Sequence, residues 1–259
     1  MEFKTITYEK KDGFAILSLN RPDSLNALNE DMKEDLKRAL SMSASDKEIR
    51  VVILTGVGRY FCAGADLTRF KKDYEHFKDT GAQSDFYDIA LSRSFVFFPK
   101  PLIAAVNGPA VGVGMTMVMA CDIRLASESA SFSCPFVRIG LTPEFGSSYH
   151  LPRLVGYARA VEWVLTGRSI KAQEAFSTGL VNQLVPPEAL LDEALKMAQG
   201  IASLPREAVE AARRLLRDGL DSGLDEAVER ETRVFHAGQK TRSHYLAVCE
   251  VLQQMKPGR

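Results

Sequence analysis

Sulfur and imidazole ligands are scarce in this sequence. Its 259 residues include four cysteines and four histidines. No two cysteines form a C-x-x-C pair, and no two histidines have the H-x-x-x-H or H-E-x-x-H spacing of helical metal sites. The cysteines lie scattered through apolar segments, which is typical of reduced, buried thiols in a cytosolic protein. We therefore expect no disulfide framework, no metal site and a cytoplasmic location.

The sequence also lacks an excess of charge of either sign. Its 33 lysine and arginine residues balance 33 aspartate and glutamate residues, and the sequence pI is about 6.9. Nucleic acids and anionic membranes both favour proteins with a clustered basic excess. The charge balance therefore argues against binding to either of these partners.

No uninterrupted apolar stretch is long enough to span a bilayer. The longest candidate, Leu102–Ala120, is broken by Asn107-Gly108-Pro109 and by Gly112 and Gly114. In lipid these breaks would leave main-chain polar groups without partners. The first 13 residues contain no apolar core of the kind that a signal peptide requires. We expect the long stretch to be buried in protein.

What the sequence does contain is a succession of short apolar runs, followed by helical periodicity. Asn29 is placed to cap a helix, residues 85–98 have a helical pattern, and a short apolar helix is expected at about Val113–Ala120. From Pro152 onward the pattern is helical apart from Leu180–Val185. The composition and this order predict an α/β core followed by a helical extension. The expected strands are Phe3–Tyr8, Phe14–Leu19, Val51–Leu54, Leu102–Val106, Ile123–Ala126 and Ser131–Cys134.

Two glycine-containing segments, residues 59–67 and 107–115, each follow a buried strand. Small residues there would let the main chain approach a ligand closely. Gly112-Val113-Gly114 supplies only part of a dinucleotide-binding motif, because Met117 occupies the place of the third glycine. The sequence also lacks a P-loop and a G-x-S-x-G nucleophile elbow.

Taken together with RPDSLNAL at residues 21–28 and IGLTPEFGSSYHLPRLVG at 139–156, these two segments resemble the crotonase superfamily, the enoyl-CoA hydratase/isomerase family. The resemblance covers most of the chain. It implies a crotonase-like ββα-spiral core over residues 1–200. It also implies a C-terminal helical trimerisation region over residues 201–259, in a homotrimer or a dimer of trimers.

By this resemblance, the main-chain N–H groups of Ala65 and Val113 would hold the thioester oxygen of an acyl-CoA. Two such donors stabilise the enolate that forms when a thioester loses its α-proton. Asp66 follows one of these donors, and we expect it to accept N–H bonds that hold the loop. Phe61, Phe136 and Phe145 are the candidates for lining the acyl pocket. The residues expected to bind substrate or CoA are Leu25, Asn26, Ala27, Arg59, Ala63, Gly64, Asp66, Leu67, Gly112 and Phe136.

The side chains near the two glycine-containing segments indicate which reaction of the family to expect. Hydratases of the family carry two glutamates at places where this sequence has Thr116 and Phe136. A carboxylate stands instead at Glu144, which is similar to the subgroup of enoyl-CoA isomerases that uses one glutamate. Such a residue would remove a proton from C2 and return it to C4, so that the double bond moves from the 3- to the 2-position. The non-catalytic interpretation of Glu144 is that its carboxylate complements the dipole of the following helix.

Other functions stay open from the sequence. Glu144 alone could support hydration, or it could act as a nucleophile in thioester hydrolysis or dehalogenation. A catalytically silent acyl-CoA-binding protein would keep the same loops, and an RNA-binding relative is disfavoured by the neutral charge. For the enzyme, we expect no metal or redox cofactor, because CoA arrives as part of the substrate.

Overall fold

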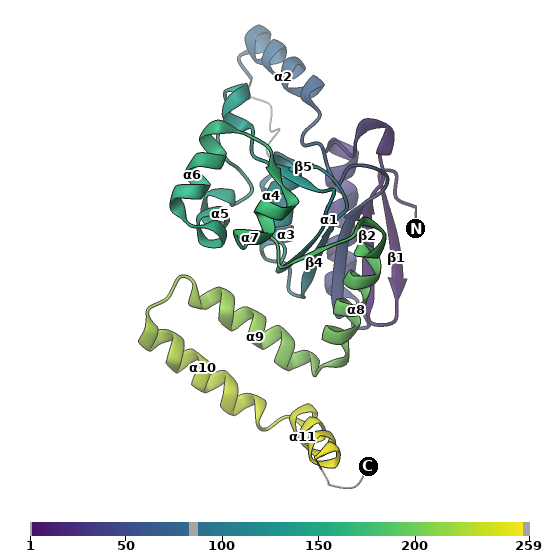
Figure 1. Ribbon diagram of the computed structural model, residues 1–259, viewed down its shortest axis with the longest axis vertical. Helices are drawn as coiled ribbons and strands as arrows, with labels where there is room; N and C mark the ends of the chain where they lie inside the picture. The colour runs from purple at the N-terminus through teal and green to yellow at the C-terminus, as the bar shows by residue number, and fades with distance from the viewer. Residues whose placement is uncertain (1, 83–87, 256–259) are drawn as a thin grey trace. The chain divides into compact units, whose positions relative to one another are not determined.

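The computed structural model describes residues 2–82 and 88–255 of the chain, which divides into two compact units, Met1–Ala198 and Gln199–Arg259. The first unit contains a six-stranded sheet with the strand order β1-β2-β3-β4-β6-β9 (Figure 1). Within this sheet, β1 and β2 pair in antiparallel fashion, and each later pair of neighbouring strands is parallel. The strands are β1 (Ile6–Lys11), β2 (Phe14–Leu19), β3 (Val51–Gly56), β4 (Leu102–Val106), β6 (Ile123–Ser127) and β9 (Gln183–Val185).

The pairing of β1 with β2 explains why the first strand begins later than the sequence pattern indicates, because Ile6 pairs with Leu19, the last residue of β2. Lys11 pairs with Phe14, so that only Asp12 and Gly13 connect the two strands. Gly13 has a φ of 83°, which glycine adopts without steric cost. The hairpin therefore extends β1 to Lys11 and starts it at Ile6, where Phe3 had been expected to begin the strand.

A second, smaller sheet has the order β5-β7-β8, with β5 (Ala110–Val111), β7 (Ser131–Ser133) and β8 (Ile170–Lys171). Its two-residue strands carry no pattern that would identify them in advance. The helices of the first unit before its boundary are α1 (Glu30–Ser45), α2 (Leu67–Thr80), α3 (Ile89–Val96), α4 (Val113–Ala120), α5 (Ser147–Val155), α6 (Tyr157–Thr166) and α7 (Ala172–Ser177). Helix α8 (Leu190–Ser203) crosses the boundary between the units.

Helix α1 illustrates how a capping residue fixes an element. The Asn29 side chain accepts a hydrogen bond from the Met32 N–H at 3.0 Å, as its place before an apolar helical pattern indicates. The apolar face of α1 packs against β1, β2 and α3. Of the helix expected at 85–98, Ile89–Val96 is helical, and residues 85–87 lie outside the described residues.

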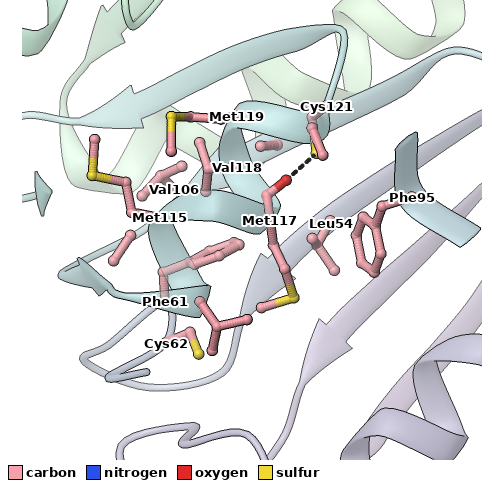
Figure 2. Packing of buried hydrophobic residues seen from close by; sticks show 14 of the residues in the cluster. Leu54, Phe61, Cys62, Phe95, Val106, Met115, Met117, Val118, Met119 and Cys121 are labelled. Carbon is pink, nitrogen blue, oxygen red and sulfur yellow. Dashed lines mark hydrogen bonds between the residues drawn. The ribbon is translucent and has the colours of Figure 1, made fainter. Parts of the chain in front are cut away.

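Helix α4 is buried on every side, which is unusual for so short an element. Figure 2 shows Met117 extending toward Leu54 and Phe61, while Met115 and Met119 lie on the other side of the helix. Its C-terminal end is also tied down, because Arg124 donates to the Cys121 carbonyl at 2.5 Å and to the Leu180 carbonyl at 2.7 Å. The N-terminus of this helix is therefore held in a fixed place by the core.

The second unit consists of α9 (Arg206–Gly219), α10 (Leu224–Gly238) and α11 (Arg242–Gln254), together with the end of α8. Helices α9 and α10 contact one another, and the Ser243 hydroxyl donates to Glu207 Oε2 at 2.8 Å. On α10, Leu224, Val228 and Phe235 follow a helical spacing and are exposed in the single chain. Trimerisation through this unit stays a prediction.

Candidate active site

Main-chain hydrogen bonds join the two glycine-containing segments to one another. The Cys62 N–H donates to the Pro109 carbonyl at 3.1 Å, and the Val111 N–H donates to the Cys62 carbonyl at 2.9 Å. On its other side, the first segment exchanges bonds with Leu28, which donates to Gly64 and accepts from Asp66. The loops after β3 and β4 thus form one continuous piece of main chain.

Glycines in the second segment are required for two reasons, an unusual main-chain conformation at Gly112 and a close approach at Gly114. Gly112 precedes α4 with a φ of 52° and a ψ of −120°, a conformation that side-chain-bearing residues rarely adopt. A Cβ added to Gly114 would lie only 2.5 Å from the Cys62 carbonyl oxygen. The glycines therefore set the contact between the segments.

Ala65 and Val113 both line a cavity of about 880 Å³. Within residues 2–82 and 88–255, neither of their main-chain N–H groups donates to a protein acceptor. Val113 is the first residue of α4, where N–H groups have no partner inside the helix and the helix dipole is positive. Two unengaged donors beside a cavity can bind an oxyanion, and the role assigned to them stays a prediction.

Glu144 lines the same cavity, in the segment that precedes α5. Its Oε1 accepts a hydrogen bond from the Thr116 hydroxyl of α4 at 2.7 Å. Burial raises the pKa of Glu144 to about 7, although the bond from Thr116 acts in the opposite direction. A carboxyl group with this pKa can both accept and return a proton near neutral pH.

The residue after Glu144 adopts a strained main-chain conformation. Phe145 has a φ of 58°, and its side chain is almost fully buried. Its ring meets the ring of Phe95 edge to face, with centroids 5.5 Å apart. This aromatic contact offsets part of the strain and fixes the segment that carries Glu144.

Thr116 and Phe136 stand at the two positions where the family resemblance implies glutamates in hydratases. Thr116 is fully buried and bound to Glu144, and Phe136 is largely buried and lines the cavity. One further carboxylate, that of Asp88, is found among the described residues that line the cavity. It caps α3 and lies 2.7 Å from Lys37 Nζ. Burial acts to raise the pKa of Asp88, but the hydrogen bonds from Lys37 and from the first turn of α3 outweigh it, so the pKa is lowered.

The structure separates the expected substrate-binding residues into two groups. Ala63, Gly64, Leu67, Gly112 and Phe136 line the cavity. Leu25, Asn26, Ala27, Arg59 and Asp66 do not. Binding of CoA by either group stays a prediction.

The second group has structural contacts of its own. The Asn26 side chain is buried, accepts from the Arg21 N–H at 2.8 Å and donates to the carbonyls of Val57 and Tyr60, so it is not available to a ligand. Asp66 accepts from the Thr68 N–H and hydroxyl at 3.2 and 2.8 Å, which caps α2. The Arg59 guanidinium lies over the Tyr60 ring.

The sequence analysis did not single out two charged residues of the cavity, Lys33 and Asp88. Lys33 is buried, and its Nζ lies 3.0 Å from Glu30 Oε1. Its spacing from the buried Leu36 and Leu40 places it on the inner face of α1, and this spacing was the available signal. Asp88 adjoins residues 83–87, and nothing in its local pattern indicates a cavity.

In the part of the chain that the structure describes, no group of three or more His, Cys, Asp or Glu side chains is arranged to share a metal ion. The helices of that same part include none with the length and apolarity needed to cross a bilayer.

Known proteins resemble this chain over nearly its whole length. The sequence profile of the family "Enoyl-CoA hydratase/isomerase" matches residues 9–253. A short-chain-enoyl-CoA hydratase of Clostridium acetobutylicum is 35% identical over 257 residues, which cover 99% of this chain and 97% of the relative. A crotonyl-CoA hydratase of Syntrophomonas wolfei is 37% identical over 258 residues, which cover 99% and 98%.

A solved structure extends the likeness to the fold. The crystal structure of an enoyl-CoA hydratase from Polaromonas sp. JS666 superposes with a TM-score of 0.90 at 30% identity, and the match covers 98% of each chain. The fold is therefore the crotonase fold that the sequence motifs predict. From its motifs, its fold and these relatives, the chain belongs to the enoyl-CoA hydratase/isomerase family.

Proposed function

We propose that the protein moves the double bond of an enoyl-CoA from the 3- to the 2-position, with Glu144 as the single acid and base. The observation that carries this proposal is the environment of Glu144, a carboxyl group bound to Thr116 in a largely apolar cavity that it shares with Ala65 and Val113. A double-bond shift needs one group that takes a proton and gives it back. It needs no bound water.

In the proposed reaction, ionised Glu144 removes a proton from C2 of the 3-enoyl thioester. The electron pair of the broken C–H bond moves into the thioester, and the negative charge that develops on its oxygen is held by the N–H groups of Ala65 and Val113. The conjugated dienolate then takes the same proton from Glu144 at C4. Atoms and charge balance without a metal or redox cofactor, and CoA enters only as part of the substrate.

Hydration of a 2-enoyl-CoA is the second candidate, and the comparisons favour it. The relatives from C. acetobutylicum and S. wolfei are both named hydratases. Glu144 would then have to deprotonate the attacking water and supply the proton to C2. The positions of Thr116 and Phe136 argue in the other direction, since neither side chain can supply a second carboxylate.

One assay separates these candidates. The purified protein is offered a 3-enoyl-CoA and, separately, a 2-enoyl-CoA, and the products are identified by mass. Isomerisation leaves the mass unchanged and creates an absorbing conjugated thioester, whereas hydration adds one water. We expect the first result; hydration of the 2-enoyl-CoA without isomerisation would establish the second candidate. Release of free CoA would indicate hydrolysis, and binding without turnover a silent acyl-CoA-binding protein.

Two further parts of the proposal concern the oligomeric state of the protein and its location in the cell. We infer a homotrimer or a dimer of trimers, with the helices of the second unit between subunits, and a cytoplasmic location. The exposed apolar side chains of α10 support the first inference, because contiguous apolar surface marks interaction sites.

A further inference from the structure

Thr116 makes two hydrogen bonds that its hydroxyl group cannot donate at the same time. Its Oγ1 lies 3.1 Å from the Val113 carbonyl oxygen and 2.7 Å from Glu144 Oε1. A threonine hydroxyl carries one proton and two lone pairs. The Val113 carbonyl can only accept, so Thr116 donates either to this carbonyl or to the carboxyl group of Glu144.

A bond from Thr116 to Glu144 is possible in both protonation states of the carboxyl group. An ionised carboxylate only accepts, so the Thr116 proton points to Oε1. A carboxyl group protonated on Oε2 keeps a carbonyl oxygen at Oε1, which still accepts from Thr116. Both states are thus satisfied in this part-buried contact with Thr116 as the donor.

We propose that Thr116 is a positioning residue whose hydroxyl donates to Glu144 Oε1 before and after each proton transfer, leaving Oε2 as the oxygen that exchanges the proton with substrate. Within the described residues, Oε2 has no hydrogen-bond partner in the protein. For the double-bond shift, a step that rests on the proposed function, one oxygen then takes the proton from C2 and returns it to C4. The transfer occurs on one face of the substrate.

The other ionisable groups near Glu144 do not determine which of its two oxygens exchanges the proton. Lys33, Asp88 and Arg138 line the cavity, and Lys33 and Asp88 have ion-pair partners of their own. The Cys134 thiol is close enough to interact electrostatically with Glu144, but burial raises its pKa to about 12. It therefore stays protonated while Glu144 titrates.

A structural role for Thr116 is the competing explanation. Buried threonines in helices commonly donate to a carbonyl three or four residues earlier, and the bond to Val113 has this form. In that case the bond to Glu144 would be incidental. The two explanations differ in what removal of the hydroxyl does to the carboxyl group.

The first measurement does not depend on turnover. Protein with ¹³C-labelled glutamate side chains is titrated by NMR, and the Glu144 signal is assigned by its loss in Glu144→Gln. In Thr116→Val, which keeps the shape of the side chain, we expect the Glu144 midpoint to rise by about one pH unit, because the bond to the charged form is stronger than the bond to the neutral form. Thr116→Ser should titrate like the parent. An unchanged midpoint in Thr116→Val would overturn the proposal.

The second measurement follows the proton itself. A 3-enoyl-CoA deuterated at C2 should give a product with deuterium at C4 in the parent and in Thr116→Ser. In Thr116→Val we expect kcat to fall about tenfold at little change in KM, with the deuterium lost to solvent, because a freed carboxyl group exposes both oxygens. Equal retention in all three proteins would contradict the assignment of Oε2.

The two measurements distinguish failure of the proposed role of Thr116 from failure of the proposed function. A shifted titration in a protein that isomerises no thioester would support the contact with Thr116 and count against the proposed function. Isomerisation by all three proteins with identical titration midpoints would leave the function standing and overturn the role of Thr116.

Discussion

At the scale of single residues, two carboxyl groups share one cavity but have opposite environments. Glu144 has a raised pKa because burial dominates, whereas Asp88 is bound to Lys37 and to the first turn of α3. Only the first is suited to exchange a proton near neutral pH. Their different environments allow a matched pair of substitutions.

Glu144→Gln should lower kcat by at least about a hundredfold, the usual contribution of a general acid and base, while an unreactive acyl-CoA still binds. Asp88→Asn removes the other negative charge among the described cavity residues but keeps a residue that caps helices well. We expect it to retain most of the activity in steady-state assays. Comparable losses in both variants would assign the effect to cavity charge instead of to Glu144.

The raised pKa of Glu144 has a cost in stability that depends on pH. Its pKa rises from the ordinary value of 4.5 to about 7 on folding, so the stabilisation that it contributes below pH 4.5 is lost as the pH rises through 7. Relative to the parent, Glu144→Gln should therefore gain up to about 3 kcal/mol of unfolding free energy between pH 4.5 and pH 8.5. Denaturant titrations at both pH values measure this gain, and a constant difference would refute the shift.

At the scale of elements, the sequence was informative wherever a local signal is sharp. The bounds of β2, β4 and α4 agree with the predictions, because turn residues or glycines border short apolar runs. Helix α2 was not predicted, since it is polar and none of its described side chains is buried. The Asp66 cap and Gly81, with a φ of 68° after the last turn, were the signals that could have identified it.

The contact between the two glycine-containing segments gives a prediction at this scale. Gly114→Ala should destabilise the protein by about 1–3 kcal/mol, because the new Cβ meets main-chain atoms of Cys62 that cannot move independently. Gly200→Ala in α8 is the control, since a Cβ there meets no atom within 4 Å. It should stabilise by about 0.5–1 kcal/mol. Thermal unfolding of both variants tests this, and equal effects would contradict the close approach.

At the scale of the whole molecule, the sequence singled out the pieces of the candidate site but not their connections. Glu144 and both glycine-containing segments line one cavity. The bond from Thr116 to Glu144 joins residues 28 positions apart, and no local pattern encodes the packing of α4 against that segment. The same reason explains why Lys33 was missed, since only the assembled fold brings α1 to the cavity.

The predicted assembly can be tested on α10. Phe235→Glu places a charge on the face that exposes Leu224 and Val228, and it should reduce the mass of the particle measured by light scattering. Arg233→Glu introduces the same side chain on the opposite face of the helix and should leave the mass unchanged. A monomeric parent, or equal effects of both variants, would contradict trimerisation through this unit.

The main-chain nature of the Ala65 and Val113 donors has a consequence for how such a protein can change. Every amino acid except proline has a main-chain N–H group. Most point mutations at these positions therefore leave the hydrogen-bond donor in place. The side chains that face the cavity, by contrast, can be replaced one at a time. Under the proposed function, mutation would therefore alter proton transfer without altering anion stabilisation, and a new reaction on a thioester would require only the relocation of an acid or a base.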